Sequence, residues 1–174
     1  MQGTDLDAKS ARPEHGRWYL PAVGIKEIYA DADVALQTTL YTCGPIALLN
    51  ALRLKGETDY TEEQLEELCQ AKPDIGTAVL RMVEVAEMVG LEVVETQMQA
   101  SIEDLERNLG DGCNVIVCYM NAYSGNSHYM LLTDHDDQAF YCRDSVFGLF
   151  RFKKAYLDGF WYGDDSKQWY LAVR

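Results

Sequence analysis

A single cysteine ahead of an apolar run is the residue best placed to do chemistry in this chain. Cys43 stands in "TLYTCGPIALLNAL", and Pro45, which fits only the first turn of a helix, predicts a helix start near Cys43. The free N–H groups and the dipole at a helix N-terminus favour a thiolate. Gly44 adds no bulk beside the sulfur, so we expect that a substrate carbonyl could approach it. We therefore predict that Cys43 is a nucleophile, although a cysteine in an apolar helix is more often a core residue.

The other four cysteines lack this context and are predicted to be structural. They are Cys69 late in a predicted helix, Cys113 in a turn, and Cys118 and Cys142 within predicted strands. An odd total of five thiols at wide spacing argues against a disulfide framework. There is no CxxC pair, so a structural zinc site is not indicated. The pattern is typical of a reducing cytoplasm, and we expect no metal or organic cofactor.

A cysteine nucleophile needs a general base, and the chain has three histidines. His15 lies in a polar N-terminal stretch and His135 in an acidic turn, and each is most simply a solvated side chain. His128 opens the apolar segment "HYMLLT" and could equally cap a sheet edge.

Hairpin pairing supplies the partner that would make His128 a base. If residue 133 faces residue 139, the constant sum of an antiparallel ladder sets His128 opposite Asp144, with Cβ atoms about 5 Å apart. Asp144 would then orient one ring nitrogen and leave the other for Cys43, as in a catalytic triad. A one-residue shift in the loop would break this register.

A side-chain amide near the cysteine would complete an acyl-transfer site. Gln37 precedes Cys43 by six residues and could stabilise an oxyanion together with the N–H of Cys43 itself. Without the other three residues, Gln37 would be an ordinary polar loop residue.

Helix signals come first along the chain and strand signals follow. A first helix is predicted at 43–55. Two more are predicted to begin at capping boxes, one formed by Thr61 with Gln64 and the other by Ser101 with Asp104. A further helix is predicted from the apolar stripe Val79, Val83, Ala86 and Val89. Strands are predicted at 114–120, 128–133, 139–144, 148–152 and 169–174, with a short helix at 153–159. This order predicts an α+β fold with N-terminal helices packed on a C-terminal antiparallel sheet. Residues 1–34 are predicted as a tail or extension with an edge strand or loop, and residues 35–174 as one domain.

Composition limits the partners. With 174 residues, 48% hydrophobic, the chain suits one globular domain, and it has no run of about eighteen apolar residues that would span a bilayer. The N-terminus lacks the apolar core of a signal peptide. The formal net charge is −13 and no basic stripe is present, so a nucleic-acid partner is not indicated. A basic peptide or protein would be attracted; the oligomeric state is not indicated.

The segment "QTTLYTCGPIALLNAL" resembles the Gln–five residues–Cys-Gly opening of the bacteriocin-processing cysteine peptidases. These are papain-like domains that cut leader peptides after a double glycine. The likeness continues through "DIGTAVLRMVEVAEMVGLEV" and "SHYMLLTDHDDQAFYCRDS" and covers about residues 35–163. The resemblance implies Cys43 as nucleophile, His128 as general base and acid, Asp144 as orienting carboxylate and Gln37 in the oxyanion hole.

Two departures and one further likeness keep the function open. Ser145 stands where the family usually has a proline after the aspartate, and no transporter segment follows, so a stand-alone domain is expected. The run "CGPIALLNAL" also resembles the phytochelatin synthases, which are papain-like transpeptidases. We expect a hydrolase that cuts a peptide or isopeptide bond through a thioester. An acyl or peptidyl transferase with the same triad, or an inactive peptide-binding module, are the alternatives.

Overall fold

The computed structural model describes residues 17–20, 25–29, 33–121, 125–162 and 167–174. Its helices are α1 (Cys43–Lys55), α2 (Glu62–Cys69), α3 (Val79–Met88), α4 (Ile102–Gly110) and α5 (Lys154–Phe160). Its strands are β1 (Arg17–Leu20), β2 (Ile25–Tyr29), β3 (Val93–Gln97), β4 (Asn114–Met120), β5 (Ser127–His135), β6 (Ala139–Asp144), β7 (Gly148–Lys153) and β8 (Tyr170–Val173). As predicted, α1 to α3 precede the strands β4 to β8, and every predicted strand is present. The strands β1 and β2 come before α1, and β3 lies between α3 and α4.

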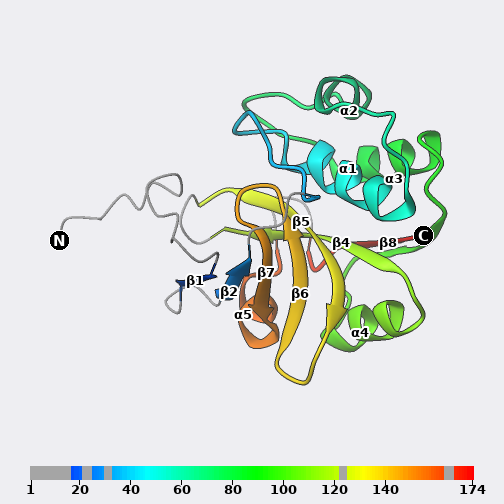
Figure 1. Ribbon diagram of the computed structural model, residues 1–174. Coiled ribbons are helices and arrows are strands. Elements are labelled where there is room, and N and C mark those ends of the chain that lie inside the picture. Colours follow the sequence, from blue (N-terminus) through cyan, green and yellow to red (C-terminus); the bar gives the residue numbers. More distant parts are fainter. Residues whose placement is uncertain (1–16, 21–24, 30–32, 122–124, 163–166) are drawn as a thin grey trace.

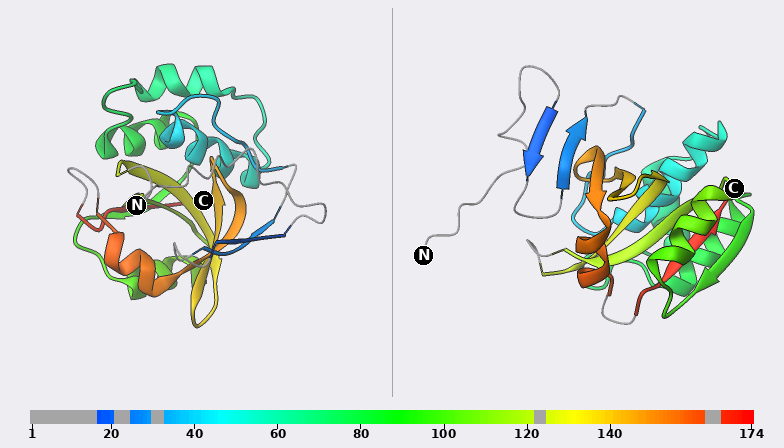
Figure 2. Two further views of the ribbon diagram at one scale, coloured as in Figure 1. Left: turned by 90° about the vertical axis from the view of Figure 1, so that its left-hand side faces the viewer. Right: turned by 90° about the horizontal axis from the view of Figure 1, so that it is seen from below.

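Within the described ranges, the strands form one eight-stranded sheet in the order β1-β2-β7-β6-β5-β4-β8-β3. All neighbouring pairs are antiparallel. Strands β1 and β2 lie at one edge, where β2 pairs with β7, so part of the N-terminal segment adds to the sheet (Figure 2). The boundary proposed at residue 34 stays a prediction.

Helices cover both faces of the sheet, with α1, α2 and α3 on one side and α4 and α5 on the other (Figure 1). The alternation of side chains along the strands separates two buried clusters. Ile116, Cys118 and Leu131 pack with α1 to α3 in the first cluster. Val117 and Met130 pack with α4 and α5 in the second cluster. The strands β4, β5 and β8 are thus buried on both faces, while β6 contributes Phe140 and Cys142 to the second cluster only.

Local sequence signals explain where the helices begin and end. Both predicted capping boxes are present: Thr61 caps α2 with Gln64, and Ser101 caps α4 with Asp104. Each cap is worth about 1 kcal/mol. Helix α1 ends at Gly56, whose φ of 88° lies in the left-handed region that glycine favours.

The predicted stripe of α3 faces the first cluster. Ala86 and Val89 are buried there, and Val79 and Val83 are partly buried and pack against it. Met82 and Val85, which the predicted stripe did not include, are also buried on this face, so the face is wider than predicted.

None of the helices in the described ranges is long and apolar enough to cross a membrane. The longest of those helices, α1, has 13 residues.

Candidate active site

Cys43 is the first residue of α1, as predicted, and its side chain lies at the edge of the first buried cluster. The residue is 7% exposed. No side chain caps the first turn of α1, and that turn holds no acidic residue. The free N–H groups of the turn are therefore available to a negative charge at the sulfur.

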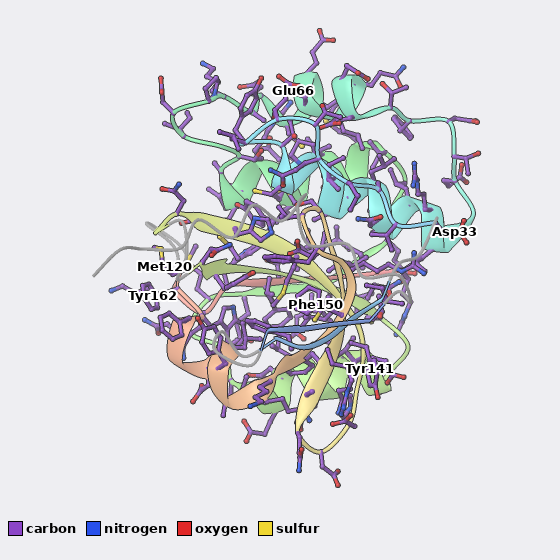
Figure 3. The ribbon with its side chains drawn as sticks, turned by 60° about the vertical axis from the view of Figure 1, so that its left-hand side comes forward. Asp33, Glu66, Met120, Tyr141, Phe150 and Tyr162 are labelled. Carbon is purple, nitrogen blue, oxygen red and sulfur yellow. The ribbon has the colours of Figure 1, made fainter. Side chains whose placement is uncertain are left out.

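The loop before Cys43 is held by α2. Glu62 Oε1 accepts hydrogen bonds from the Thr38 N–H at 2.9 Å and from the Thr42 hydroxyl at 2.5 Å. The Tyr41 hydroxyl donates to Glu66 at 2.9 Å; Figure 3 shows Glu66 on α2, on the outer side of the molecule. Sequence reasoning missed this support, because an acid in a first helical turn already has a local explanation in the helix dipole.

His128 and Asp144 meet on neighbouring strands. His128 Nε2 lies 2.8 Å from Asp144 Oδ2, and Asp144 is fully buried. The second carboxylate oxygen, Oδ1, accepts hydrogen bonds from the N–H groups of Val146 at 2.7 Å and Phe147 at 3.0 Å. The carboxylate is thus fixed at both ends, and Nδ1 is the ring nitrogen left for Cys43.

The predicted register of the β5–β6 hairpin is wrong by two residues, although the predicted contact is present. Asp144 faces Met130, and His128 lies one step further along the same face. An irregularity between Leu132 and Asp134 takes up one residue, Thr133, as a β-bulge does. A shift of two residues keeps the same face, and a diagonal neighbour is still within reach of an imidazole.

The Cys43 thiol and the His128 imidazole form a hydrogen bond, and each shifts the pKa of the other. Burial raises the pKa of the Cys43 thiol, and the charge of Asp144 raises it further. The hydrogen bond and charge of His128, together with a hydrogen bond from the Tyr129 backbone, outweigh these effects, so the pKa of Cys43 lies below its ordinary value. Burial lowers the pKa of His128, yet the charge and hydrogen bond of Asp144 reverse this and raise it well above its ordinary value. Both directions favour a thiolate paired with an imidazolium.

Tyr119 is a neighbour of the histidine that sequence reasoning did not single out for this role. It faces His128 across β4 and β5, and the two rings meet edge to face with centroids 5.7 Å apart. Tyr119 is 3% exposed, so its ring shields the imidazole from solvent and limits its rotation. The only sequence signal was an aromatic residue in a buried strand.

Gln37 contacts Ser145, the residue that follows Asp144. The Gln37 N–H donates to the Ser145 carbonyl at 2.8 Å, and the Ser145 hydroxyl donates to Gln37 Oε1 at 2.5 Å. Gln37 Nε2 donates one hydrogen to the Thr39 carbonyl at 2.6 Å. An amide nitrogen carries two hydrogens, so one donor of Gln37 remains for another acceptor.

Gly44 has a different role from the one predicted. A Cβ at this position would lie 3.0 Å from Met82 Sδ and 3.1 Å from Thr77. The space beside Gly44 is therefore filled by α3 and the loop before it. The glycine permits close packing of α1 against these residues, rather than the approach of a substrate.

The remaining candidates lie elsewhere or are held differently. The other four cysteines are buried and form no disulfide. Burial raises the pKa of Cys69 to about 12 and that of Cys142 well above its ordinary value. His135 lies at the far end of β5, with its Nδ1 3.3 Å from Lys154 Nζ. His15 falls outside the described residues. In the part of the chain that the structure describes, no three His, Cys, Asp or Glu residues are grouped to hold a metal ion.

Comparison with known proteins identifies the family of the chain. Residues 31–163 match the model of the Peptidase C39 family, and the chain therefore belongs to this family of cysteine peptidases. No curated protein matches the sequence.

Solved structures show the same fold at low sequence identity. A double glycine motif protease from an AMS/PCAT transporter, solved in complex with the leader peptide, is 20% identical, with a TM-score of 0.63 over 80% of this chain and 89% of that one. The peptidase domain of Streptococcus ComA, a bifunctional ABC transporter, is 22% identical, with a TM-score of 0.63 over 80% and 94%. A protein described as a C39-like peptidase from Bacillus anthracis is 12% identical, with a TM-score of 0.62 over 84% and 96%. The predicted α+β papain-like fold is confirmed.

Proposed function

We propose that Cys43, His128 and Asp144 form the catalytic triad of this peptidase, with Gln37 as an oxyanion donor. The observation that carries the proposal is the imidazole of His128, which bonds the Cys43 thiol and the buried Asp144 carboxylate at once. An imidazole held in this way has a defined tautomer and a fixed orientation, as a nucleophile's base requires.

The reaction would proceed through a thioester. The Cys43 thiolate attacks the carbonyl carbon of the scissile bond, and the resulting oxyanion accepts hydrogen bonds from Gln37 Nε2 and the Cys43 N–H. As the C–N bond breaks, the leaving amine takes a proton from His128. Water then attacks the thioester, gives one proton to the neutral His128, and releases the acid and the Cys43 thiolate.

The substrate we propose is a peptide whose leader is cut after small residues. Two relatives of similar fold are a double glycine motif protease and the ComA peptidase domain. Cys43 and His128 are each only 7% exposed, so residues next to the scissile bond must be narrow, and glycine needs the least room. The net charge of −13 would favour a basic peptide. Five cysteines that form no disulfide support a reducing compartment such as the cytoplasm.

Substitution of the nucleophile tests the proposal. Cys43→Ala should abolish cleavage of a peptide that carries Gly-Gly before the scissile bond, while Cys113→Ala, at a buried cysteine of the other cluster, should keep it. The summed masses of the two products should exceed the substrate mass by one water. A product that carries an added acceptor molecule would indicate acyl transfer instead of hydrolysis. Cleavage that survives in Cys43→Ala would disprove the assignment. Equal cleavage of Gly-Gly and Leu-Leu peptides would disprove the substrate.

A further inference from the structure

Ser145 makes two hydrogen bonds with Gln37, a residue 108 positions away in the chain. Its carbonyl accepts from the Gln37 backbone N–H at 2.8 Å, and its hydroxyl donates to Gln37 Oε1 at 2.5 Å. Ser145 is 4% exposed, so water competes little for its hydroxyl. The backbone contact fixes the position of residue 37, and the hydroxyl contact acts on the side-chain amide alone.

An amide can serve as an oxyanion donor only when its nitrogen, not its oxygen, faces the oxyanion. The two ends of a glutamine amide have nearly the same shape, so the surrounding hydrogen bonds decide its orientation. The Thr39 carbonyl is an acceptor only and selects Nε2 at 2.6 Å. The Ser145 hydroxyl then donates to Oε1. A reversed amide would set two carbonyl oxygens against each other at Thr39, and Ser145 would lose its acceptor.

Ser145 also follows the residue that orients the histidine. Asp144 holds His128 through Oδ2 and closes the turn through Oδ1, which accepts from the N–H groups of Val146 and Phe147. One short turn therefore fixes both the imidazole and the Gln37 amide. We propose that Ser145 is a positioning residue, which holds the Gln37 amide in the orientation that stabilises the oxyanion. This inference rests on the proposed function.

The test distinguishes an effect on oxyanion stabilisation from an effect on the reactivity of the Cys43 thiolate. Ser145→Ala removes the hydroxyl and leaves the backbone contact. We expect kcat, and the affinity for a peptide aldehyde that forms a tetrahedral adduct with Cys43, to fall about tenfold, less than the roughly hundredfold loss expected for Gln37→Ala. The rate at which iodoacetamide alkylates Cys43 should not change, because alkylation forms no oxyanion. Ser145→Thr, which keeps a hydroxyl, should restore the aldehyde affinity.

Two results would overturn the role of Ser145 alone. If Ser145→Ala slows alkylation as much as it lowers kcat, the residue supports the whole site and has no special effect on the oxyanion. If Ser145→Ala costs as much in a Gln37→Ala background as in the wild type, it does not act through Gln37. Failure of the proposed function would look different, because cleavage would then persist in Cys43→Ala. Melting temperatures of all variants identify any loss that comes from unfolding.

Discussion

The two ends of strand β5 each carry a histidine near acidic residues, yet they are built differently. At the first end, which we call the site end, His128 is 7% exposed and meets the fully buried Asp144. At the hairpin end, His135 is only partly buried and lies beside Lys154. The acid of that turn, Asp136, accepts from the N–H groups of Gln138 and Ala139.

The difference teaches that the kinds of residue do not define a site. Hydrogen bonds from the turn backbone, chiefly that of Gln138, and the neighbouring Arg151 lower the pKa of Asp136 to about 2, but its oxygens serve the turn and an ion pair. Asp144 also closes a turn, through one oxygen, and gives the other to a histidine. Burial and a directed partner separate the two ends.

The largest difference should appear when each of the two histidines is replaced by alanine. His128→Ala removes the proposed base and should lower kcat/KM by about 10⁴-fold or more. His135→Ala should change kcat/KM less than twofold. Peptide cleavage followed by mass spectrometry measures both. A comparable loss in the two variants would mean that the two ends do not differ in function.

Substitution of the two aspartates should also lower kcat more at the site end than at the hairpin end, but by a smaller factor than for the histidines. In Asp144→Asn, the amide nitrogen would face His128 Nε2 and move the ring proton to Nδ1, where the imidazole cannot accept a proton from Cys43. We expect kcat to fall about 10³-fold. Asp136→Asn should leave kcat within twofold. A wild-type rate in Asp144→Asn would assign the orienting role to another group.

Close packing should matter at the site end and not at an exposed helix end. Gly44→Ala places a Cβ 3.0 to 3.1 Å from Met82 and Thr77, which should cost about 1–3 kcal/mol and lower kcat as Cys43 moves from His128. Gly110→Ala is the matched control, since its Cβ would meet nothing within 4 Å. Thermal unfolding measures the stability of both variants. Equal melting temperatures would show that α3 shifts to accept the added Cβ without a loss of stability.

The smallest effect is a shift in the pH profile. The imidazolium–thiolate pair exists between the lowered pKa of Cys43 and the raised pKa of His128, so kcat/KM should be bell-shaped, with both limits belonging to the pair. Asp144 raises the pKa of His128. In Asp144→Asn the alkaline limb should therefore move to lower pH, while His135→Ala should leave both limbs in place. An unmoved alkaline limb would contradict this.

Much of the fold follows from local sequence, because its signals act over short distances. The capping boxes at Thr61 and Ser101, and Pro45 in the first turn of α1, set helix starts through contacts within one turn. The strand β6 was predicted at its observed bounds, since a buried run between turn residues leaves few alternatives.

The members of the proposed site were named from the sequence, whereas the geometry of their contacts was not. Cys43 and His128 stand at element starts that the sequence marks. The bulge at Thr133 depends on how the whole hairpin packs, so the register could not be derived from loop length. The bond between Ser145 and Gln37 joins segments 108 positions apart, and no short-range pattern records it. Gly44 was explained by substrate access because α3 could not be placed.

The bulge at Thr133 has a consequence for how this hairpin can vary. Side chains alternate between the two faces of a strand, so one residue gained or lost at the tip would invert the strand beyond it unless a bulge absorbed the change. On the His128 side of the bulge, the register is set by the pairing of Met130 with Asp144, away from the tip of the hairpin. We therefore expect that residues inserted at 136–138 would leave the imidazole and its carboxylate aligned.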